Sequence, residues 1–485
     1  MTAAFDCDVL IIGGGPTGVT LAALLARRGV GVIVAEKEAD IYPLPRAAHV
    51  DHEGMRILQE AGAAEAVMAT SRRADRYEFR NAKGRVLLCF TGANQTGPGG
   101  WPVANMIHQP SVEAALRRAL LEQESADLRA GWEMLSFAED DAGVTAQFAA
   151  PEGERSIRAR WLVGADGARS PVRKACGISF EDLGFEEPWL VVDVLVDDPA
   201  RLPAANLQIC DPARPTTCVL MGEGRHRWEF MILPGETPEQ VSTDEAVERL
   251  LAPWHVEGAV RIERKAVYTF RARIAENWRK GRVLLAGDAA HQTPPFAGQG
   301  MCSGLRDAAN LAWKLAAVTK GEASGDLLDT YQPERAPNLR ATIDMAIMMG
   351  RMVCTTSRIG ARVRDAKFAF ARMLGKLPDG PPAYPPIAGG AIWAGSKAAG
   401  SYFPQVVASD GTRLDDVLGP DAWLIALDDL GEERLAPFAN GLHAWFDRTS
   451  VSAVLVRPDR YVFGTGEAEV IEARWQAALG LDPPA

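Results

Sequence analysis

Residues 7–37 read "CDVLIIGGGPTGVTLAALLARRGVGVIVAEK" and predict the start of a nucleotide-binding fold. The apolar run at residues 8–12 is short and rich in β-branched side chains, which indicates a buried strand. Gly13, Gly15 and Gly18 follow in a GxGxxG pattern. Such glycines permit a tight turn, close approach of the backbone to a pyrophosphate, and packing of the next helix on the sheet. We therefore expect the amino terminus of that helix to face phosphates.

The rest of this stretch completes a strand–helix–strand unit. Residues 19–28 have the leucine and alanine content of a helix, Gly29 can end it, and "VGVIVAE" supplies a second parallel strand. Glu36 closes that strand 18 residues after Gly18, where a carboxylate can accept hydrogen bonds from an adenosine ribose. The order favours a dinucleotide site over a purely structural turn. It does not distinguish NAD from FAD.

A second loop lies far downstream, in "GRVLLAGDAAHQTPPFAGQG" at residues 281–300. Its apolar start predicts a strand that delivers Asp288 to the carboxyl end, where ligands of α/β sheets bind. Apolar residues then recur at helical spacing, so Gly298 and Gly300 stand at a helix entrance. The positive end of that helix can stabilise charge on a reduced flavin lying against the glycines, and Pro294 with the next proline stiffens the approach. The alternative is a rigid turn before a core helix.

Three blocks carry a family resemblance: "GGGPTG", "WLVGADGARSPVR" and "GDAAHQTPPFAGQGMCSGLRDAANLAWKL". Together they resemble the single-component FAD-dependent aromatic hydroxylases, especially the phenol hydroxylase and 3-(3-hydroxyphenyl)propionate hydroxylase branch. The resemblance covers nearly the whole chain. It implies an α/β fold: a Rossmann-like FAD-binding domain, an inserted antiparallel β-sheet substrate domain, and a thioredoxin-like C-terminal domain.

The resemblance also implies a reaction. NADPH or NADH reduces non-covalently bound FAD, and O2 then forms a flavin C(4a)-hydroperoxide that hydroxylates a phenolic ring. Because a phenol has an unperturbed pKa of about 10, we expect a base or a cation beside the substrate hydroxyl. No second GxGxxG with strand and helix context occurs, so a separate NAD(P)H domain is not expected. A flavin oxidase or dehydrogenase, and a flavoprotein without enzymatic activity, remain open alternatives.

The family pattern assigns cofactor contacts residue by residue. It implies that Asp288 binds the ribityl and pyrophosphate region of FAD. The residues implied to line the isoalloxazine ring are Pro294, Gly298, Gln299 and Gly300. Further positions that match FAD contacts of the family are Arg46, Gln109 and Asp166. The alternative for Arg46 and Gln109 is a surface arginine and a helix-capping glutamine. Arg169 and Arg173, after Asp166, can hold a phosphate or pair with acidic groups.

Three residues are candidates for catalysis. His49 follows Arg46 by three residues and could lie beneath the flavin ring, although a loop histidine is often a packing residue. Arg227, in "HRWEFMIL", could stabilise a phenolate or the peroxide from the sheet side, or form a structural ion pair. Pro294 belongs to the expected wall of the flavin site.

The expected domain boundaries follow from changes in residue composition and pattern along the sequence. Residues 1–185 and 265–375 are predicted to form one interrupted FAD-binding domain, and residues 186–264 a substrate-binding β-sheet insert with short β-rich runs. The proline- and glycine-rich residues 374–390 indicate a linker. Residues 391–485 would form the thioredoxin-like domain, which lacks CxxC and every other cysteine, so packing or dimer contact is its expected role.

Composition excludes several classes of partner. The net charge of −11 disfavours nucleic acid, and seven scattered cysteines support neither a disulfide framework nor a metal site. No targeting segment or membrane span is visible, which predicts a cytoplasmic protein. The expected partners are a phenolic substrate and O2, with a homodimer as a further possibility.

Overall fold

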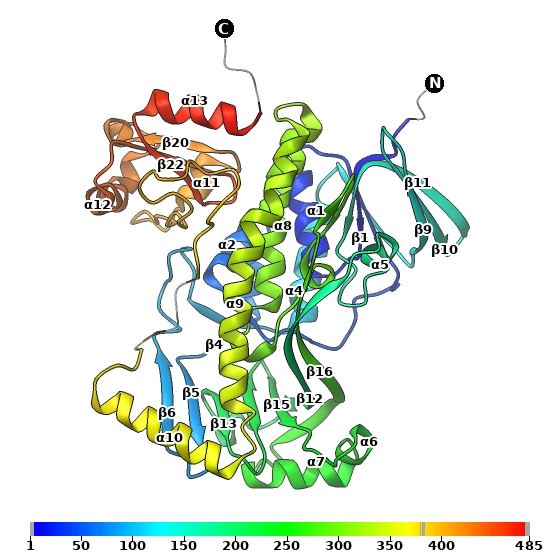
Figure 1. Cartoon of the computed structure of the whole chain (residues 1–485), viewed down its shortest axis with the longest axis vertical. Helices are drawn as coiled ribbons and strands as arrows, with labels where there is room; N and C mark the ends of the chain where they lie inside the picture. The colour runs from blue at the N-terminus through cyan, green and yellow to red at the C-terminus, as the bar shows by residue number, and fades with distance from the viewer. Residues whose placement is uncertain (1–3, 379, 381–383, 481–485) are drawn as a thin grey trace.

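A computed structural model of the chain describes residues 4–378, 380 and 384–480. Residues 379 and 381–383 of the predicted linker and residues 481–485 of the predicted C-terminal domain lie outside the described residues. Figure 1 shows a parallel sheet, a curved sheet below it, and a smaller C-terminal region. Two long helices run between these parts, α8 (Gly300–Lys320) and α9 (Tyr331–Val353).

The parallel sheet is built around the first apolar run of the chain. Its strands follow the order β17-β18-β11-β1-β2-β8, and every pair from β18 to β8 is parallel. The bounds are β17 (Arg279–Lys280), β18 (Val283–Leu285), β11 (Gly153–Gly164), β1 (Cys7–Ile12), β2 (Val32–Glu36) and β8 (Ala126–Ala130). Strands β9 (Glu133–Glu139) and β10 (Val144–Ala150) extend β11 as an antiparallel meander.

The register of this sheet brings distant loops together. Ile12 pairs with Gly164, and Gly164 pairs with Leu285, so β1, β11 and β18 end level with one another. Parallel strands place their carboxyl ends at one edge. The glycine loop, the "GADG" turn and the "GDAAH" loop therefore open at the same edge of the sheet.

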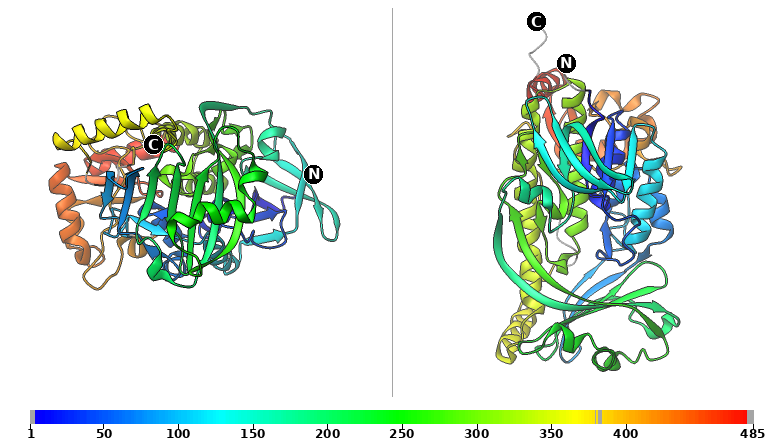
Figure 2. Two further views of the ribbon diagram at one scale, coloured as in Figure 1. Left: turned by 90° about the horizontal axis from the view of Figure 1, so that it is seen from below. Right: turned by 90° about the vertical axis from the view of Figure 1, so that its right-hand side faces the viewer.

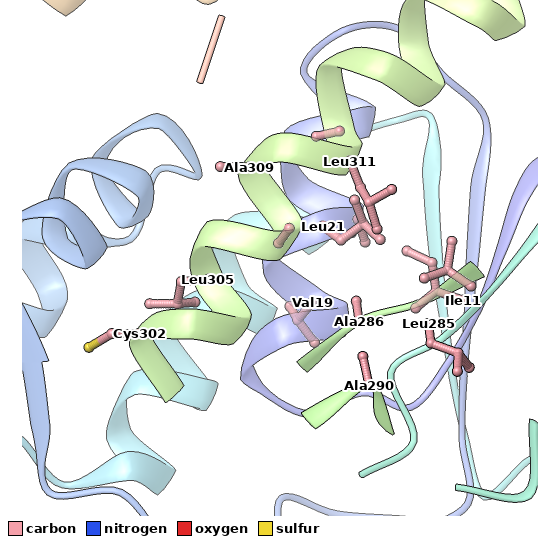
Figure 3. Packing of buried hydrophobic residues seen from close by; sticks show 14 of the residues in the cluster. Ile11, Val19, Leu21, Leu285, Ala286, Ala290, Cys302, Leu305, Ala309 and Leu311 are labelled. Carbon is pink, nitrogen blue, oxygen red and sulfur yellow. The ribbon is translucent and has the colours of Figure 1, made fainter. Parts of the chain in front are cut away.

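Helices α1 (Pro16–Ala26) and α8 pack together beside the sheet, as Figure 3 shows. Leu21 of α1 and Leu305 of α8 belong to one fully buried cluster, in which each such side chain contributes about 1.5–3 kcal/mol. A Cβ on Gly304 would overlap the Thr17 hydroxyl, so this glycine permits the close crossing. The other helices around this part are α2 (His52–Glu60), α3 (Ala64–Ala69), α4 (Gln109–Leu121) and α5 (Pro171–Ala175). Helix α10 (Arg358–Met373) lies lower, beside β6 (Val86–Thr91), as Figure 1 shows.

A curved sheet closes the site from below. Its order is β19-β16-β12-β15-β14-β13-β5-β6, antiparallel except for the β13–β5 pair. The bounds are β19 (His291–Gln292), β16 (Val260–Ala275), β12 (Phe180–Val196), β15 (Arg225–Met231), β14 (Thr216–Leu220), β13 (Asn206–Cys210), β5 (Arg76–Asn81) and β6 (Val86–Thr91). The sheet thus includes strands from before residue 186, the predicted start of the β-sheet insert. The predicted domain boundaries stay a prediction.

The two faces of the curved sheet differ in chemistry. Its outer face is covered by α6 (Pro238–Val241) and α7 (Asp244–Leu251), as Figure 2 shows, and buries Trp228 and Phe230 against them. Because side chains alternate along a strand, Arg227 and Glu229 point to the other face. That inner face is turned toward the carboxyl edge of the parallel sheet. A small third sheet, in the order β3-β7-β4, comprises β3 (His49–Asp51), β7 (Ala104–Met106) and β4 (Arg72–Arg73).

The C-terminal region docks on the long helices. It holds an antiparallel sheet and three helices: β20 (Trp423–Ala426), β21 (Ala453–Val456), β22 (Val462–Gly466), α11 (Leu414–Leu418), α12 (Ala439–Thr449) and α13 (Ala468–Ala478). Arg457 forms a fully buried ion pair with Glu334 of α9 at 2.6 Å, and Lys314 of α8 lies 2.9 Å from the same carboxylate. The predicted fold class is confirmed. Within the described ranges, no helix has the length and apolar character that a membrane span requires.

Candidate active site

The glycine loop after β1 leaves space where a phosphate is expected. Gly13 has a φ of +109°, and a Cβ there would overlap the carbonyl of Ala165. A Cβ on Gly18 would overlap the carbonyl oxygen of Gly13. By contrast, a Cβ on Gly15 would meet no described atom within 4 Å. The loop is therefore tight on its protein side and open on the other, which suits a pyrophosphate at the amino terminus of α1.

Two charged side chains meet this loop. Glu36, at the end of β2, accepts a hydrogen bond from the Gly14 N–H at 2.6 Å and another from the Glu38 N–H at 2.9 Å. Arg117 of α4 donates to the Gly14 carbonyl at 3.2 Å, and its buried Nε has no partner among the described residues. A cation with a spare donor suits a pyrophosphate. Sequence reasoning missed Arg117 because it lies within a helix, outside every motif.

The loop after β18 presents one free carboxylate. Asp288 is exposed although Gly287 and Ala289 beside it are buried, and no hydrogen bond involves it in the described part of the chain. The loop is held from behind by Asp307, which accepts from the Gly287 N–H at 3.0 Å and lies 2.6 Å from His291 Nε2. The Asp288 carboxylate is thus free to accept hydrogen bonds at the carboxyl edge of the sheet, as hydroxyls of a ribityl chain would require.

The polar side chains of the "GADG" turn and the residues after it mostly contact neighbouring parts of the protein. Asp166 accepts from the Val172 N–H at 3.0 Å, its second oxygen is buried without a partner among the described residues, and burial raises its pKa. Arg173 donates to the Ala289 carbonyl at 3.1 Å and lies over the Phe180 ring at 3.8 Å, which ties the turn to the "GDAAH" loop. Arg169 is exposed.

The expected flavin loop combines a buried approach with an open helix end. Pro294 is buried, Gly298 ends a short turn with a φ of +66°, and α8 begins at Gly300. A Cβ on Gly300 would meet nothing within 4 Å in the described structure. Gln299 is buried, and its side chain faces away from solvent: Nε2 donates to the Tyr384 hydroxyl at 2.8 Å. The side chain of Gln299 is therefore engaged with the predicted linker.

Three of the predicted residues converge on one segment beside this loop. Gln109 accepts from the N–H groups of Arg46 at 3.0 Å and Ala47 at 2.6 Å, while the Arg46 side chain is exposed. His49 Nδ1 lies 3.2 Å from the Gly298 carbonyl oxygen. Burial lowers the pKa of His49, so the ring is neutral at pH 7 and donates through Nδ1.

The curved sheet holds this segment from the other side. Arg227 pairs with Asp193 at 2.6 Å and donates to the carbonyls of Arg46 at 2.8 Å and Pro45 at 2.6 Å. Arg264 donates to the same Pro45 carbonyl at 2.7 Å. Two buried guanidinium groups of the sheet therefore fix the chain at residues 45–46.

The same sheet also holds the flavin loop. The Tyr77 hydroxyl donates to the Phe296 carbonyl at 2.9 Å, and Gln208 Nε2 donates to Tyr77 at 2.8 Å. Trp189 stands edge-on to Phe296, with ring centroids 5.6 Å apart. The carboxyl edge of the parallel sheet and the inner face of the curved sheet are thus two walls joined through residues 45–46 and 294–300. The individual roles predicted for site residues stay predictions.

The residues present fit FAD better than a metal. The described ranges contain no group of three or more His, Cys, Asp or Glu side chains that could hold a metal ion. They do contain an open glycine loop, a free arginine donor, a free carboxylate and an open helix amino terminus in the order of pyrophosphate, ribityl chain and ring.

Comparison with known proteins agrees with this geometry. The FAD binding domain family matches residues 6–346, and the HcaD C-terminal domain matches residues 431–480. A probable NADH-specific resorcinol 4-hydroxylase of Rhodococcus jostii (strain RHA1) is 37% identical over 494 residues, which cover 94% of this chain and 91% of that protein.

Two further similarities extend this result. A 3-(3-hydroxy-phenyl)propionate/3-hydroxycinnamic acid hydroxylase of Comamonas testosteroni is 43% identical over 363 residues, which cover 74% of this chain and 61% of the relative. The crystal structure of aklavinone-11 hydroxylase with FAD and aklavinone superposes with a TM-score of 0.81 at 26% identity, covering 99% of this chain and 100% of that one. The chain belongs to the single-component FAD-dependent aromatic hydroxylases, the family that its three sequence blocks resemble.

Proposed function

We propose that this chain hydroxylates a small phenolic substrate with O2 and NADH or NADPH, between the two walls described above. The observation that supports this most is the position of polar side chains on the curved sheet, opposite the loops expected to hold FAD. Relatives whose names specify a resorcinol and a hydroxyphenylpropionate support a phenol as substrate, and the NADH-specific relative favours NADH.

FAD, when bound, accepts a hydride from the nicotinamide and activates O2 for transfer of one oxygen atom to the ring. The protein's own side chains and backbone would position the cofactor and exclude water. The open glycine loop and Arg117 would orient the pyrophosphate, and Asp288 would accept from the ribityl hydroxyls. The amino terminus of α8, at Gly300, would stabilise negative charge on the ring.

Water would be excluded mainly by aromatic side chains. Phe296 of the flavin loop packs edge-on to Trp189, Phe270 and Phe185, with ring centroids 5.6 to 6.0 Å apart. A dry site strengthens the electrostatic contacts of the reacting groups and protects reactive intermediates from hydrolysis. Neutral His49 would hold the Gly298 carbonyl rather than carry charge.

The remaining expectations are proposals as well. We infer an interrupted FAD-binding domain over residues 1–185 and 265–375, a cytoplasmic compartment, and assembly as a homodimer. Sedimentation of the purified protein would distinguish monomer from dimer.

The test is a turnover assay of the purified holoenzyme with phenol, resorcinol and 3-(3-hydroxyphenyl)propionate. NADH and NADPH are compared, O2 is isotopically labelled, and product is identified by mass. We expect substrate-stimulated NAD(P)H oxidation and one labelled oxygen atom in the product. Hydrogen peroxide without labelled product would instead indicate an oxidase, and absence of substrate-stimulated oxidation with every phenol would indicate a flavoprotein without this activity.

A further inference from the structure

One carboxylate on the inner face of the curved sheet has no hydrogen bond within the described structure. Glu229 is buried, with 6% of its surface exposed, in the middle of β15. The cation paired with it is Arg227, whose Nη1 lies 3.7 Å from Oε1, beyond hydrogen-bonding distance. Buried carboxylates are normally paired and hydrogen-bonded. Glu229 is therefore an acceptor without a donor.

The neighbouring arginine is already neutralised. Arg227 makes hydrogen bonds to both oxygens of Asp193, at 2.6 and 3.1 Å, and to two backbone carbonyls. Four of its five N–H donors are thus occupied in these bonds. Its charge is shared with Asp193, which leaves Glu229 without a counter-ion of its own.

The other polar groups in the same row are committed to one another. Thr217 lies opposite Glu229 in the strand register and donates to Gln208 Oε1 at 2.8 Å. Gln208 donates to Tyr77, and the Tyr77 hydroxyl donates to the Phe296 carbonyl. Thr217, Gln208 and Tyr77 therefore each donate to an acceptor of the protein, and the chain of bonds ends on the flavin loop.

The position of Glu229 is set by these two neighbours. Arg227 contacts the carbonyls of residues 45–46, and Tyr77 contacts the flavin loop at Phe296. Burial and the nearby charge of Glu229 raise the pKa of Tyr77, so the two side chains are within electrostatic range. Glu229 accordingly lies near both segments that link the walls of the site, residues 45–46 and the flavin loop.

Resting on the proposed function, we propose that Glu229 is the base that accepts the proton of the substrate's ring hydroxyl. The O–H bond of the phenol breaks, the proton bonds to a carboxylate oxygen of Glu229, and the electron pair stays on the ring oxygen. The ring carbons then carry more electron density, as attack by an electrophilic oxygen requires. Glu229 releases the proton to solvent before the next turnover.

The electrostatic surroundings fit this role. Burial raises the pKa of Glu229 to about 7, against the opposing effect of Arg227 on its own strand and with the help of Asp193 on β12. Tyr77 on β5 is within electrostatic range of Glu229, and Arg264 of β16 contacts the same Asp193. A base with this pKa is closer to that of a phenol than an ordinary carboxylate, so proton transfer is less unfavourable. The base form is present above about pH 7 and is lost below it.

The test compares Glu229→Gln with Glu229→Asp and with a matched control, Glu263→Gln. Glu263 lies on β16 of the same sheet in a partly exposed ion pair with Arg225 at 3.0 Å, away from residues 45–46 and from the flavin loop. The first measurement is the affinity of the oxidised holoenzyme for a phenol and for its O-methyl ether, each titrated with pH. The ether has no hydroxyl proton, so the difference reports the contact of that proton with its acceptor without turnover. The second measurement is the rate at which hydroxylated product forms, as a function of pH.

We expect the hydroxylation rate of the parent and of Glu263→Gln to rise with pH, with a midpoint near pH 7, and both proteins to bind the phenol more tightly than its ether above that pH. Glu229→Gln should keep FAD, lose this preference for the phenol, and hydroxylate about 100-fold more slowly without a rise near pH 7. Glu229→Asp should retain part of the rate with a displaced midpoint. A parental pH profile and a parental preference for the phenol in Glu229→Gln would overturn the proposal.

If Glu229→Gln does not fold, Glu229→Ala decides by the same measurements, because it also removes the carboxylate. A rate and a pH profile equal to those of the parent in Glu229→Ala would contradict the role. The proposed function is judged separately, since it fails when the parent itself hydroxylates no phenol.

Discussion

The two walls of the site are built in different ways. The carboxyl edge of the parallel sheet is built from loops whose backbone is free, so that Gly15, Gly300 and the Asp288 carboxylate are left open. The inner face of the curved sheet is built from buried side chains that bond one another, with Arg227 and Asp193 at its centre. A cofactor that stays bound can be held by backbone and loops, whereas the substrate differs between enzymes of one family and is contacted by side chains that can vary. We call the carboxyl edge the cofactor wall and the inner face of the curved sheet the substrate wall, and the predictions below test this division.

The largest effect is expected from closing the cofactor wall. Gly13→Ala would cost about 1–3 kcal/mol for the left-handed backbone and would also overlap the Ala165 carbonyl. We expect FAD affinity to fall about 100-fold or more, measured by fluorescence titration of the apoprotein. Gly258→Ala is the control, because Gly258 has a φ of +71° but no described neighbour within 4 Å. Parental FAD affinity in Gly13→Ala would show that the tight side of the loop is dispensable.

The next effect concerns the substrate wall and its stability. Arg227→Leu would leave Asp193 as a buried charge with one weaker partner, Arg264 at 3.4 Å. Removing one member of a buried pair costs about 3–5 kcal/mol, so we expect a loss of that size in urea unfolding. Arg225→Leu breaks a partly exposed pair of the same sheet and should cost less than about 1 kcal/mol. Equal losses in the two variants would contradict the central place of the Arg227–Asp193 pair.

A smaller effect should follow from removing the free carboxylate of the cofactor wall. Asp288→Ala loses an acceptor for the ribityl hydroxyls, worth about 1–3 kcal/mol, which corresponds to about 5- to 150-fold weaker FAD binding. Its stability should change little, because Asp288 makes no hydrogen bond in the described structure. Asp447→Ala, on the exposed face of α12, serves as the control. Unchanged FAD affinity would remove Asp288 from the site.

The smallest effect is expected where the flavin ring would rest. Gly300→Val has space for its side chain, since a Cβ at Gly300 meets nothing within 4 Å in the described structure, so the protein should fold and bind FAD. The branched side chain would instead displace the ring, and the ratio of hydroxylated product to NADH consumed should fall by about 2- to 10-fold as hydrogen peroxide is released. Gly325→Val, another open position, should keep the parental ratio. A parental ratio in Gly300→Val would mean that this helix end does not carry the ring.

The same division explains how much could be predicted from the sequence. The cofactor wall consists of motifs in which glycine, proline and aspartate follow a strand, so Gly13, Asp288 and Gly300 can be named from the sequence alone. The substrate wall draws Tyr77, Gln208, Thr217 and Glu229 from four strands, two of which, β5 and β13, are joined in parallel across more than a hundred residues.

Nothing local to those strands predicts their order, and so their common face could not be foreseen. The one available signal was a pair of charged residues, Arg227 and Glu229, two positions apart in the otherwise mostly apolar "HRWEFMIL". Arg117 was missed for a related reason, because the direction of a side chain within a helix depends on which partner the helix packs against. The contact of Gln299 with Tyr384 likewise depends on where the predicted linker runs.

The most direct test of the two-wall account measures two quantities on two variants under the same conditions. FAD affinity and the pH dependence of the hydroxylation rate are determined for Asp288→Ala and for Glu229→Gln. The account predicts that Asp288→Ala binds FAD about 5- to 150-fold more weakly but, when saturated with FAD, shows the parental pH dependence, with a midpoint near pH 7. It predicts that Glu229→Gln has parental FAD affinity and a hydroxylation rate that no longer rises near pH 7. Loss of FAD affinity in Glu229→Gln together with a parental pH dependence would contradict the account, because the two walls would then not have separate tasks.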